Sequence, residues 1–197
     1  MTSGLRIPKA EISGAYGDQV KQISRAMFGE VPESVEVMGH NPDVFAVVFG
    51  LMRGTDGWDA CDEGLKSLAD MAASALVGCS FCMDLGYFMA HHRDVDETKV
   101  REVPRWRESD VFTPLERDVM AYAEAMCQTP PTVSDELFAR LLDALGPAAM
   151  LELTAVVAIA NVPARLNLAL GITSQGFSKV CELPLAEPSP GRVAASG

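Results

Sequence analysis

Apolar residues recur every three or four positions along most of the chain, which is the period of an amphipathic helix. In "GDQVKQISRAMF", for example, Val20, Ile23 and Met27 fall on one helical face. The same period predicts further helices over 42–54, 59–78, 79–93, 114–128, 135–146 and 147–171. No segment alternates apolar and polar residues as a half-buried strand does, so the predicted fold class is all-α.

Capping residues mark several of these boundaries. Thr113 precedes a proline and stands three residues before Glu116, which is the pattern of a capping box. Gly78 is suited to end one helix directly before Cys79. Pro147 is suited to the first position of the last long helix.

Small residues line several of the predicted helices and allow close approach of helix axes, which favours a compact bundle. The run 155–160 is apolar on all sides. Such a helix is either central in its own fold or shared with a partner chain. We therefore expect a homo-oligomer.

Charge and composition exclude several kinds of partner. The 197 residues carry a formal net charge of −11, with 48% hydrophobic and 22% charged residues. No run of Lys or Arg offers the basic surface that nucleic acids or anionic membranes require. "MTSGLRIPKAEISG" lacks the apolar core of a secretory signal, and no apolar run reaches the ~18–20 residues of a membrane span. We expect a cytoplasmic protein.

In "GCSFC", Cys79 and Cys82 lie three residues apart at the predicted start of a helix. A tightened first turn brings such side chains close enough for a disulfide, and the helix N-terminus stabilises a thiolate. The pair is therefore suited to dithiol–disulfide chemistry. Metal binding, or the packing of two small apolar thiols, remains an alternative.

A metal site fits the sequence poorly. The other cysteines, Cys61, Cys127 and Cys181, are far apart, and no second CxxC is present. On a continuous helix His91 would lie about 13 Å beyond Cys82 along the axis. His91 and His92 are adjacent and face different sides, and at a helix end they favour the C-terminal dipole. We expect no metal and no other cofactor.

"LADMAASALVGCSFCMDLGYFMA", followed later by "ELTAVVAIANVPARLNLALGI", resembles the carboxymuconolactone decarboxylase family and its alkylhydroperoxidase D-like members. The resemblance covers roughly residues 40–172 and implies an alkylhydroperoxidase D-like helical bundle that forms oligomers. It divides the chain into an N-terminal helical extension (1–40), the family-like domain (41–180) and a flexible tail (181–197).

The resemblance also implies roles for the cysteines: Cys82 attacks a hydroperoxide and Cys79 closes the disulfide. The redox members carry a glutamate twelve residues before the first cysteine and a histidine four after the second, which form a proton relay. This chain has Ser67 and Gly86 at those positions. Neither takes up a proton near neutral pH, so the relay is missing from its expected places.

Acidic residues nearby are Asp70 and Glu63, one turn to either side of the relay position. Asp84 lies in the first turns of the next helix, where favourable helix electrostatics account for an acid. Which thiol attacks stays open at this point. The helix N-terminus favours Cys79, whereas the resemblance favours Cys82.

We therefore expect a thiol-dependent peroxidase, an antioxidant-type oxidoreductase that takes a hydroperoxide or small organic substrate and electrons from an unknown thiol donor. One alternative is a non-catalytic ligand-binding or scaffold protein. Another is a lactone decarboxylase-like enzyme, which would need a basic group such as Arg165 or Arg53 to hold a substrate carboxylate. Aromatic residues could line a pocket or fill the core: Tyr87, Trp106, Phe81 and Phe88.

Overall fold

A computed structural model describes residues 4–93, 95–181 and 183–188, and this part of the chain contains helices and no strands. The all-α prediction is confirmed. The α-helices are α1 (Gly14–Phe28), α2 (Glu33–Met38), α3 (Pro42–Arg53), α4 (Glu63–Val77), α5 (Ser80–His92), α6 (Glu97–Val100), α7 (Pro114–Cys127) and α8 (Asp135–Leu170). Two short 3₁₀ helices are η1 (Val103–Arg105) and η2 (Phe177–Val180).

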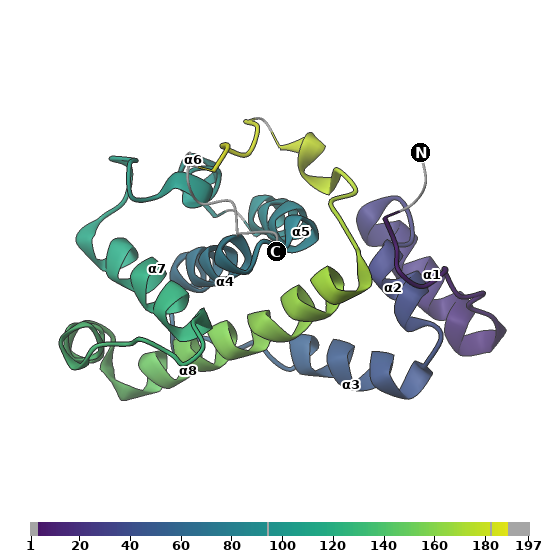
Figure 1. Ribbon diagram of the computed structural model, residues 1–197, viewed down its shortest axis with the longest axis horizontal. Helices are drawn as coiled ribbons and strands as arrows, with labels where there is room; N and C mark the ends of the chain where they lie inside the picture. The colour runs from purple at the N-terminus through teal and green to yellow at the C-terminus, as the bar shows by residue number, and fades with distance from the viewer. Residues whose placement is uncertain (1–3, 94, 182, 189–197) are drawn as a thin grey trace.

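Helix α4 lies at the centre of the bundle and packs against α5, α7 and α8 (Figure 1). Leu68 and Met71 on its buried face belong to the same core cluster as Met120 of α7 and Leu153 of α8. A second apolar cluster surrounds Cys79 at the start of α5. Burial of these side chains is the main force that holds the helices together, and it fixes α5 between the two clusters.

Helix α8 is broken at Gly146, whose φ of 75° lies in the left-handed region. The predicted division before Pro147 is therefore confirmed, because the backbone leaves the helical conformation there and restarts. By length and composition α8 could cross a membrane, yet a single such helix is weak evidence. In this structure α8 packs against α3, α4, α5 and α7, as the core helix of a globular bundle does. The absence of a membrane partner stays a prediction.

Described segments on both sides of the bundle's main helices contact it. Phe28 at the end of α1 packs on Phe88 and Phe177. After η2, the backbone carbonyl of Leu183 accepts a hydrogen bond from Tyr87, and the Ala186 amide donates to the carbonyl of Arg101. Part of the predicted flexible tail thus packs on α5 and α6, while residues 182 and 189–197 lie outside the described residues. The division at residue 40 stays a prediction.

Candidate functional site

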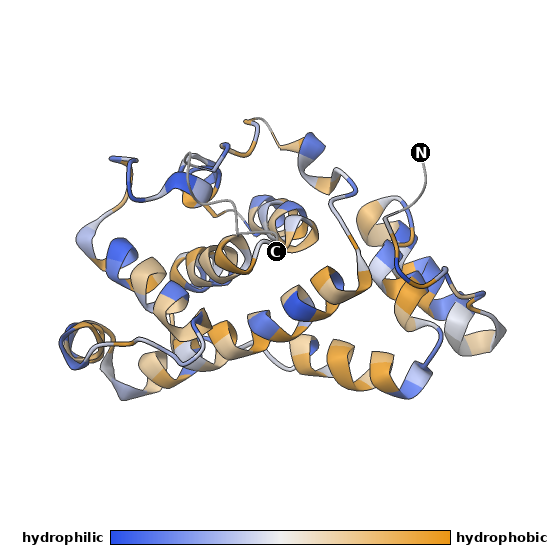
Figure 2. Cartoon of the chain, in the orientation of Figure 1, coloured by the Kyte–Doolittle hydropathy of each residue, from blue (hydrophilic) through white to orange (hydrophobic). Residues whose placement is uncertain are grey.

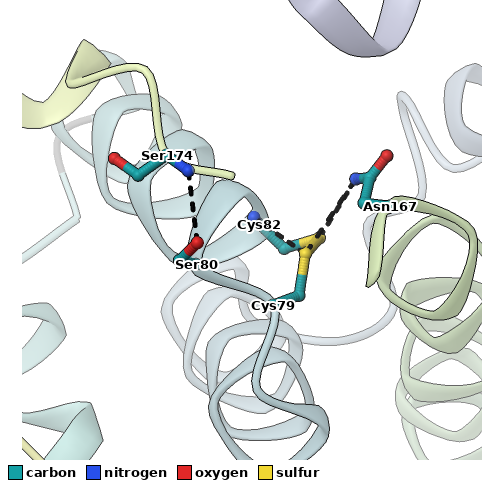
Figure 3. Close-up of a disulfide and its surroundings, with 5 residues drawn as sticks. All are labelled: Cys79, Ser80, Cys82, Asn167 and Ser174. Atoms are coloured by element: carbon teal, nitrogen blue, oxygen red, sulfur yellow. Dashed lines mark hydrogen bonds between the residues drawn. A yellow bond between two sulfur atoms is a disulfide. The ribbon is translucent and has the colours of Figure 1, made fainter. Parts of the chain in front are cut away.

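A disulfide bond links Cys79 to Cys82 at the start of α5 (Figure 3). Gly78 ends α4 with a φ of 84°, a conformation that favours glycine, and Cys79 becomes the N-cap of the next helix. The Cys79 sulfur accepts a hydrogen bond of 3.2 Å from the backbone amide of Cys82. The Cα atoms are 5.3 Å apart, within the range that disulfides span.

The two cysteines differ in access to solvent. Cys79 has only 1% of its surface exposed, whereas Cys82 is partly exposed. A thiolate that the helix N-terminus stabilises at Cys79 reacts only if a substrate can reach it. Burial removes that advantage, and Cys82 is the sulfur that solvent and small molecules reach more easily.

Asn167 is a site residue that the sequence analysis missed. It projects from α8 toward the disulfide, is 4% exposed, and places its side-chain nitrogen 3.5 Å from the Cys82 sulfur (Figure 3). The same nitrogen lies 3.9 Å from the Cys79 sulfur. An amide donor here stabilises negative charge on either sulfur when the pair is reduced. A polar residue within an apolar helix was the available signal.

Asp84 is buried and binds a distant loop rather than the thiols. Its carboxylate accepts hydrogen bonds from the backbone amides of residues 175–178 and from the hydroxyls of Ser174 and Ser178. Burial by itself would raise the pKa of Asp84, but the hydrogen bonds from Ser178, Ser174 and Phe177 lower it. Helix electrostatics alone therefore do not explain Asp84, because it anchors the segment after α8.

At the missing relay, Asp70 lies beside Gly86. A β-carbon added at Gly86 would stand 3.7 Å from the Asp70 Oδ2 atom and 3.1 Å from Met71 Cγ. Desolvation raises the pKa of Asp70 to about 6, and the positive charge of Arg93 offsets only part of this effect. Glu63, the other nearby acid, instead pairs with Arg93 and Lys66.

An open cavity of about 530 Å³ lies at the C-terminal ends of α4 and α7. Its apolar wall includes Val77, which also packs in the cluster around Cys79. Arg165 lines the cavity and donates a hydrogen bond of 3.2 Å to the carbonyl of Cys127. Arg53, the other candidate for binding a carboxylate, lies 3.7 Å from Asp56 instead. The remaining lining residues are Leu76, Gln128, Thr129 and Leu168.

The candidate aromatic residues belong to the core. Each of the four is at most 6% exposed: Tyr87, Trp106, Phe81 and Phe88. Trp106 donates its indole N–H to Glu124, which satisfies the one polar group of that side chain. Of the two alternatives for these residues, the structure supports packing.

The histidines end α5, as the sequence predicts. His92 Nδ1 lies 2.9 Å from the carbonyl oxygen of Phe88, and His91 Nδ1 contacts the Glu97 carboxylate. Neither contact involves the disulfide.

Residues 42–125 match the model of the carboxymuconolactone decarboxylase family. The uncharacterized protein YnjA of Escherichia coli (strain K12) is 32% identical over 165 residues, which is 81% of this chain and 88% of YnjA. The debrominase Bmp8 is 25% identical with a TM-score of 0.71 over 83% of this chain and 88% of Bmp8.

An alkylhydroperoxidase AhpD core from Ralstonia eutropha JMP134, described as an uncharacterized peroxidase-related protein, has the same fold. Its TM-score is 0.79 at 18% identity, over 91% of this chain and 97% of that protein. The family match, the relation to YnjA and the shared fold agree. The chain belongs to the carboxymuconolactone decarboxylase family, in which it resembles the alkylhydroperoxidase D-like proteins.

Proposed function

We propose that the chain is a thiol-dependent peroxidase in which Cys82 attacks a hydroperoxide and Cys79 closes the disulfide. The observation that carries the proposal is the arrangement of the pair. Cys82 is the more exposed residue of the pair, a disulfide joins it to Cys79, and the Asn167 amide points at both sulfurs. Family membership supports a peroxidase-related activity.

In the proposed reaction the Cys82 thiolate attacks one peroxide oxygen and the O–O bond breaks. The other oxygen leaves as an alcohol after taking a proton, and Cys82 becomes a sulfenic acid. The Cys79 sulfur then attacks the Cys82 sulfur, so the S–S bond forms and the hydroxyl leaves as water. The peroxide is reduced by two electrons, and an external dithiol returns the pair to its reduced form.

Asp70 is the proton acceptor that this mechanism uses in place of the absent glutamate and histidine. It faces α5 at Gly86, one helical turn beyond Cys82. With a pKa raised to about 6, its carboxylate is mostly ionised at neutral pH and takes up a proton more readily than an ordinary aspartate. Asp84 cannot serve, because six donors already occupy it.

The relation to Bmp8 favours a second candidate, the reductive removal of bromine from a small aromatic ring. Bmp8 is called a debrominase, and a cysteine-to-alanine variant of it has been crystallised with 2,3,4-tribromopyrrole. A dithiol supplies the same two electrons here: the C–Br bond breaks, a C–H bond forms, and bromide, a proton and the disulfide are the products. The cavity beside Val77 offers an apolar wall and one guanidinium, that of Arg165.

Thiol counting under anaerobic conditions tests both candidates. The reduced chain has five cysteines, and one equivalent of cumene hydroperoxide should leave the three that are free in the structure: Cys61, Cys127 and Cys181. The Cys82→Ser variant should keep its remaining thiols, whereas Cys127→Ser should lose two as the parent does. If both thiols survive peroxide but disappear with release of bromide from tribromopyrrole, the second function replaces the first. Survival of the pair under both treatments would favour a non-catalytic binding protein.

We also propose that copies of this chain associate through α3 and α8, which pack on each other. Both helices carry apolar side chains that the chain itself leaves exposed. Val47 on α3 is 71% exposed and Leu151 on α8 is 72% exposed. Figure 2 shows α3 as one of the most hydrophobic helices, although it lies at the edge of the bundle. The partner for this surface would be a second copy of the chain, because the apolar run 155–160 of α8 predicts a helix shared between chains.

A further inference from the structure

Three side chains of different kinds meet near the C-terminal end of α5, whereas the disulfide lies at its N-terminal end. His91 lies at the C-terminal end of α5, Glu97 opens α6, and Cys181 directly follows η2. One ligand atom from each lies within 4.8 Å of the other two. All three residues are partly buried, so each is held by the fold and still reached by solvent.

We propose that, contrary to the expectation of no metal from the sequence, His91, Glu97 and Cys181 form a binding site for a divalent transition metal of the zinc type. Imidazole nitrogen, carboxylate oxygen and thiolate sulfur are the three donors that Zn²⁺ uses in proteins. The thiolate and imidazole select against Mg²⁺ and Ca²⁺, which bind oxygen ligands. Three protein ligands leave the fourth tetrahedral position for water.

The separation of the ligand atoms suits this use. A zinc ion about 2.0–2.3 Å from each ligand requires the ligand atoms to lie about 3.5 Å from one another. Without a bound ion, the three ligand atoms already lie within 4.8 Å of one another. His91 and Glu97 are already in contact, so a bound ion would have to separate their ligand atoms slightly and draw the Cys181 sulfur toward them.

Hydrogen bonds join the segment after Cys181 to the helices that carry His91 and Glu97. The Tyr87 hydroxyl donates to the carbonyl of Leu183, 2.7 Å away, and also interacts with the Glu97 carboxylate. Arg101 donates to the carbonyl of Pro184 and accepts from the Ala186 amide. Residues 183, 184 and 186 are thus held against α5 and α6, and the Cys181 amide donates to the carbonyl of Ser178. Ligands that the fold already holds lose little further entropy on binding.

Binding requires loss of the Cys181 thiol proton and a free ring nitrogen on His91. Because His91 Nδ1 donates its proton to Glu97 in this structure, that proton must move to Nε2, or Nε2 itself must be the ligand atom. The Cys181 S–H bond breaks, the proton passes to solvent, and no electron changes hands. The bound ion would join the C-terminal segment to α5, the helix whose first turn holds the disulfide. The proposal does not depend on the peroxidase function, because none of its ligands contacts Cys79 or Cys82.

Cobalt titration of a Cys79→Ser/Cys82→Ser double variant tests the site, since the reduced pair can no longer compete for metal. We expect one Co²⁺ per chain with tetrahedral d–d bands and a sulfur-to-cobalt charge-transfer band, all lost on addition of Zn²⁺. A further Cys181→Ser change should abolish the charge-transfer band, and His91→Ala should weaken binding at least about tenfold. His92→Ala and Cys127→Ser are the matched controls and should leave the titration unchanged.

X-ray absorption of the zinc-loaded double variant gives an independent readout that does not rely on further substitutions. We expect one sulfur and otherwise nitrogen or oxygen neighbours. A zinc shell without sulfur would overturn the proposal, as would a charge-transfer band that persists in the Cys181→Ser protein. Failure to bind Co²⁺ at all would overturn it too.

Discussion

The carboxylate of Asp70 lies next to Gly86: a β-carbon at residue 86 would be 3.7 Å from Asp70 Oδ2. In the redox members that this chain resembles, the residue at that place on α5 is a histidine. Gly86 has no side chain to fill that space, and the Asp70 carboxylate on α4 borders the space. An acidic group thus remains near the expected relay although both sequence positions have changed.

Asp70→Asn should slow oxidation of the reduced pair by hydroperoxide about a hundredfold, because a positioned proton acceptor typically contributes at least that factor. Stopped-flow measurement of thiol loss at pH 7.5 checks the rate. Ser67→Ala is the control, since Ser67 stands at the relay position in sequence but cannot accept the proton near neutral pH. Equal slowing by both substitutions would contradict a specific role for Asp70.

The same Asp70→Asn variant should be more stable than the parent at pH 7.5 and not at pH 4. The pKa of Asp70 rises from 3.8 to about 6 on folding, so the folded chain binds the proton more tightly. This contribution to stability is present below pH 4 and is lost as the pH rises through 6. Thermal unfolding of the parent and the variant at both pH values measures this difference in stability. An equal gain in stability at pH 7.5 and pH 4 would contradict the raised pKa of Asp70.

Asn167→Ala should reduce the reactivity of the reduced pair about tenfold, because a hydrogen bond to a charged sulfur is lost. Alkylation of Cys82 by iodoacetamide at fixed pH is the measurement. Asn161→Ala is the matched control: it removes a donor of the same kind, 3.1 Å from the Cys127 sulfur, on the same helix. If Asn167→Ala leaves the alkylation rate of Cys82 unchanged while Asn161→Ala lowers it, the Asn167 contact has no effect on the pair.

Asp84→Asn should lower the free energy of unfolding by about 3 kcal/mol or more at neutral pH, since several amides lose a charged acceptor. The pKa of Asp84 is lowered in the fold, so its contribution is present above the unfolded pKa and is lost as the pH falls through the folded value. The gap between parent and variant should therefore narrow in acid. Urea unfolding measures this difference. Asp118→Asn is the mild control, because Asp118 is only partly buried and pairs with the exposed Arg140.

Val47→Glu and Leu151→Glu should each shift the protein toward monomer in sedimentation velocity at micromolar concentration, because a buried unpaired charge opposes association. Val180→Glu is the control, as Val180 is 61% exposed on η2. If the parent chain itself sediments as a monomer, association through α3 and α8 is wrong.

Much of the fold could be predicted from local pattern. The period of the apolar residues defines the main helices, and the capping box at Thr113 and Glu116 is present as expected. The break at Gly146 before Pro147 also followed from the sequence. These features depend on residues a few positions apart, so a single sequence contains them.

The surroundings of the cysteines could not be predicted in this way. Asn167 lies 85 residues after Cys82 in the chain, and the donors to Asp84 lie about as far away. No periodicity relates such positions, because tertiary packing alone brings them together. Burial of Cys79 likewise depends on the cluster that includes Phe177 and Ile172.

The contacts of Asp84 with residues 174–178 also determine when the site becomes complete. During synthesis α4 and α5 leave the ribosome first, whereas Asn167 follows 85 residues after Cys82 and Gly176 follows 92 residues after Asp84. The cysteines of a growing chain therefore lack the side chains that surround them in the finished fold. Ribosome-bound chains ending before residue 167 should react faster with a thiol reagent at Cys79 than released full-length protein.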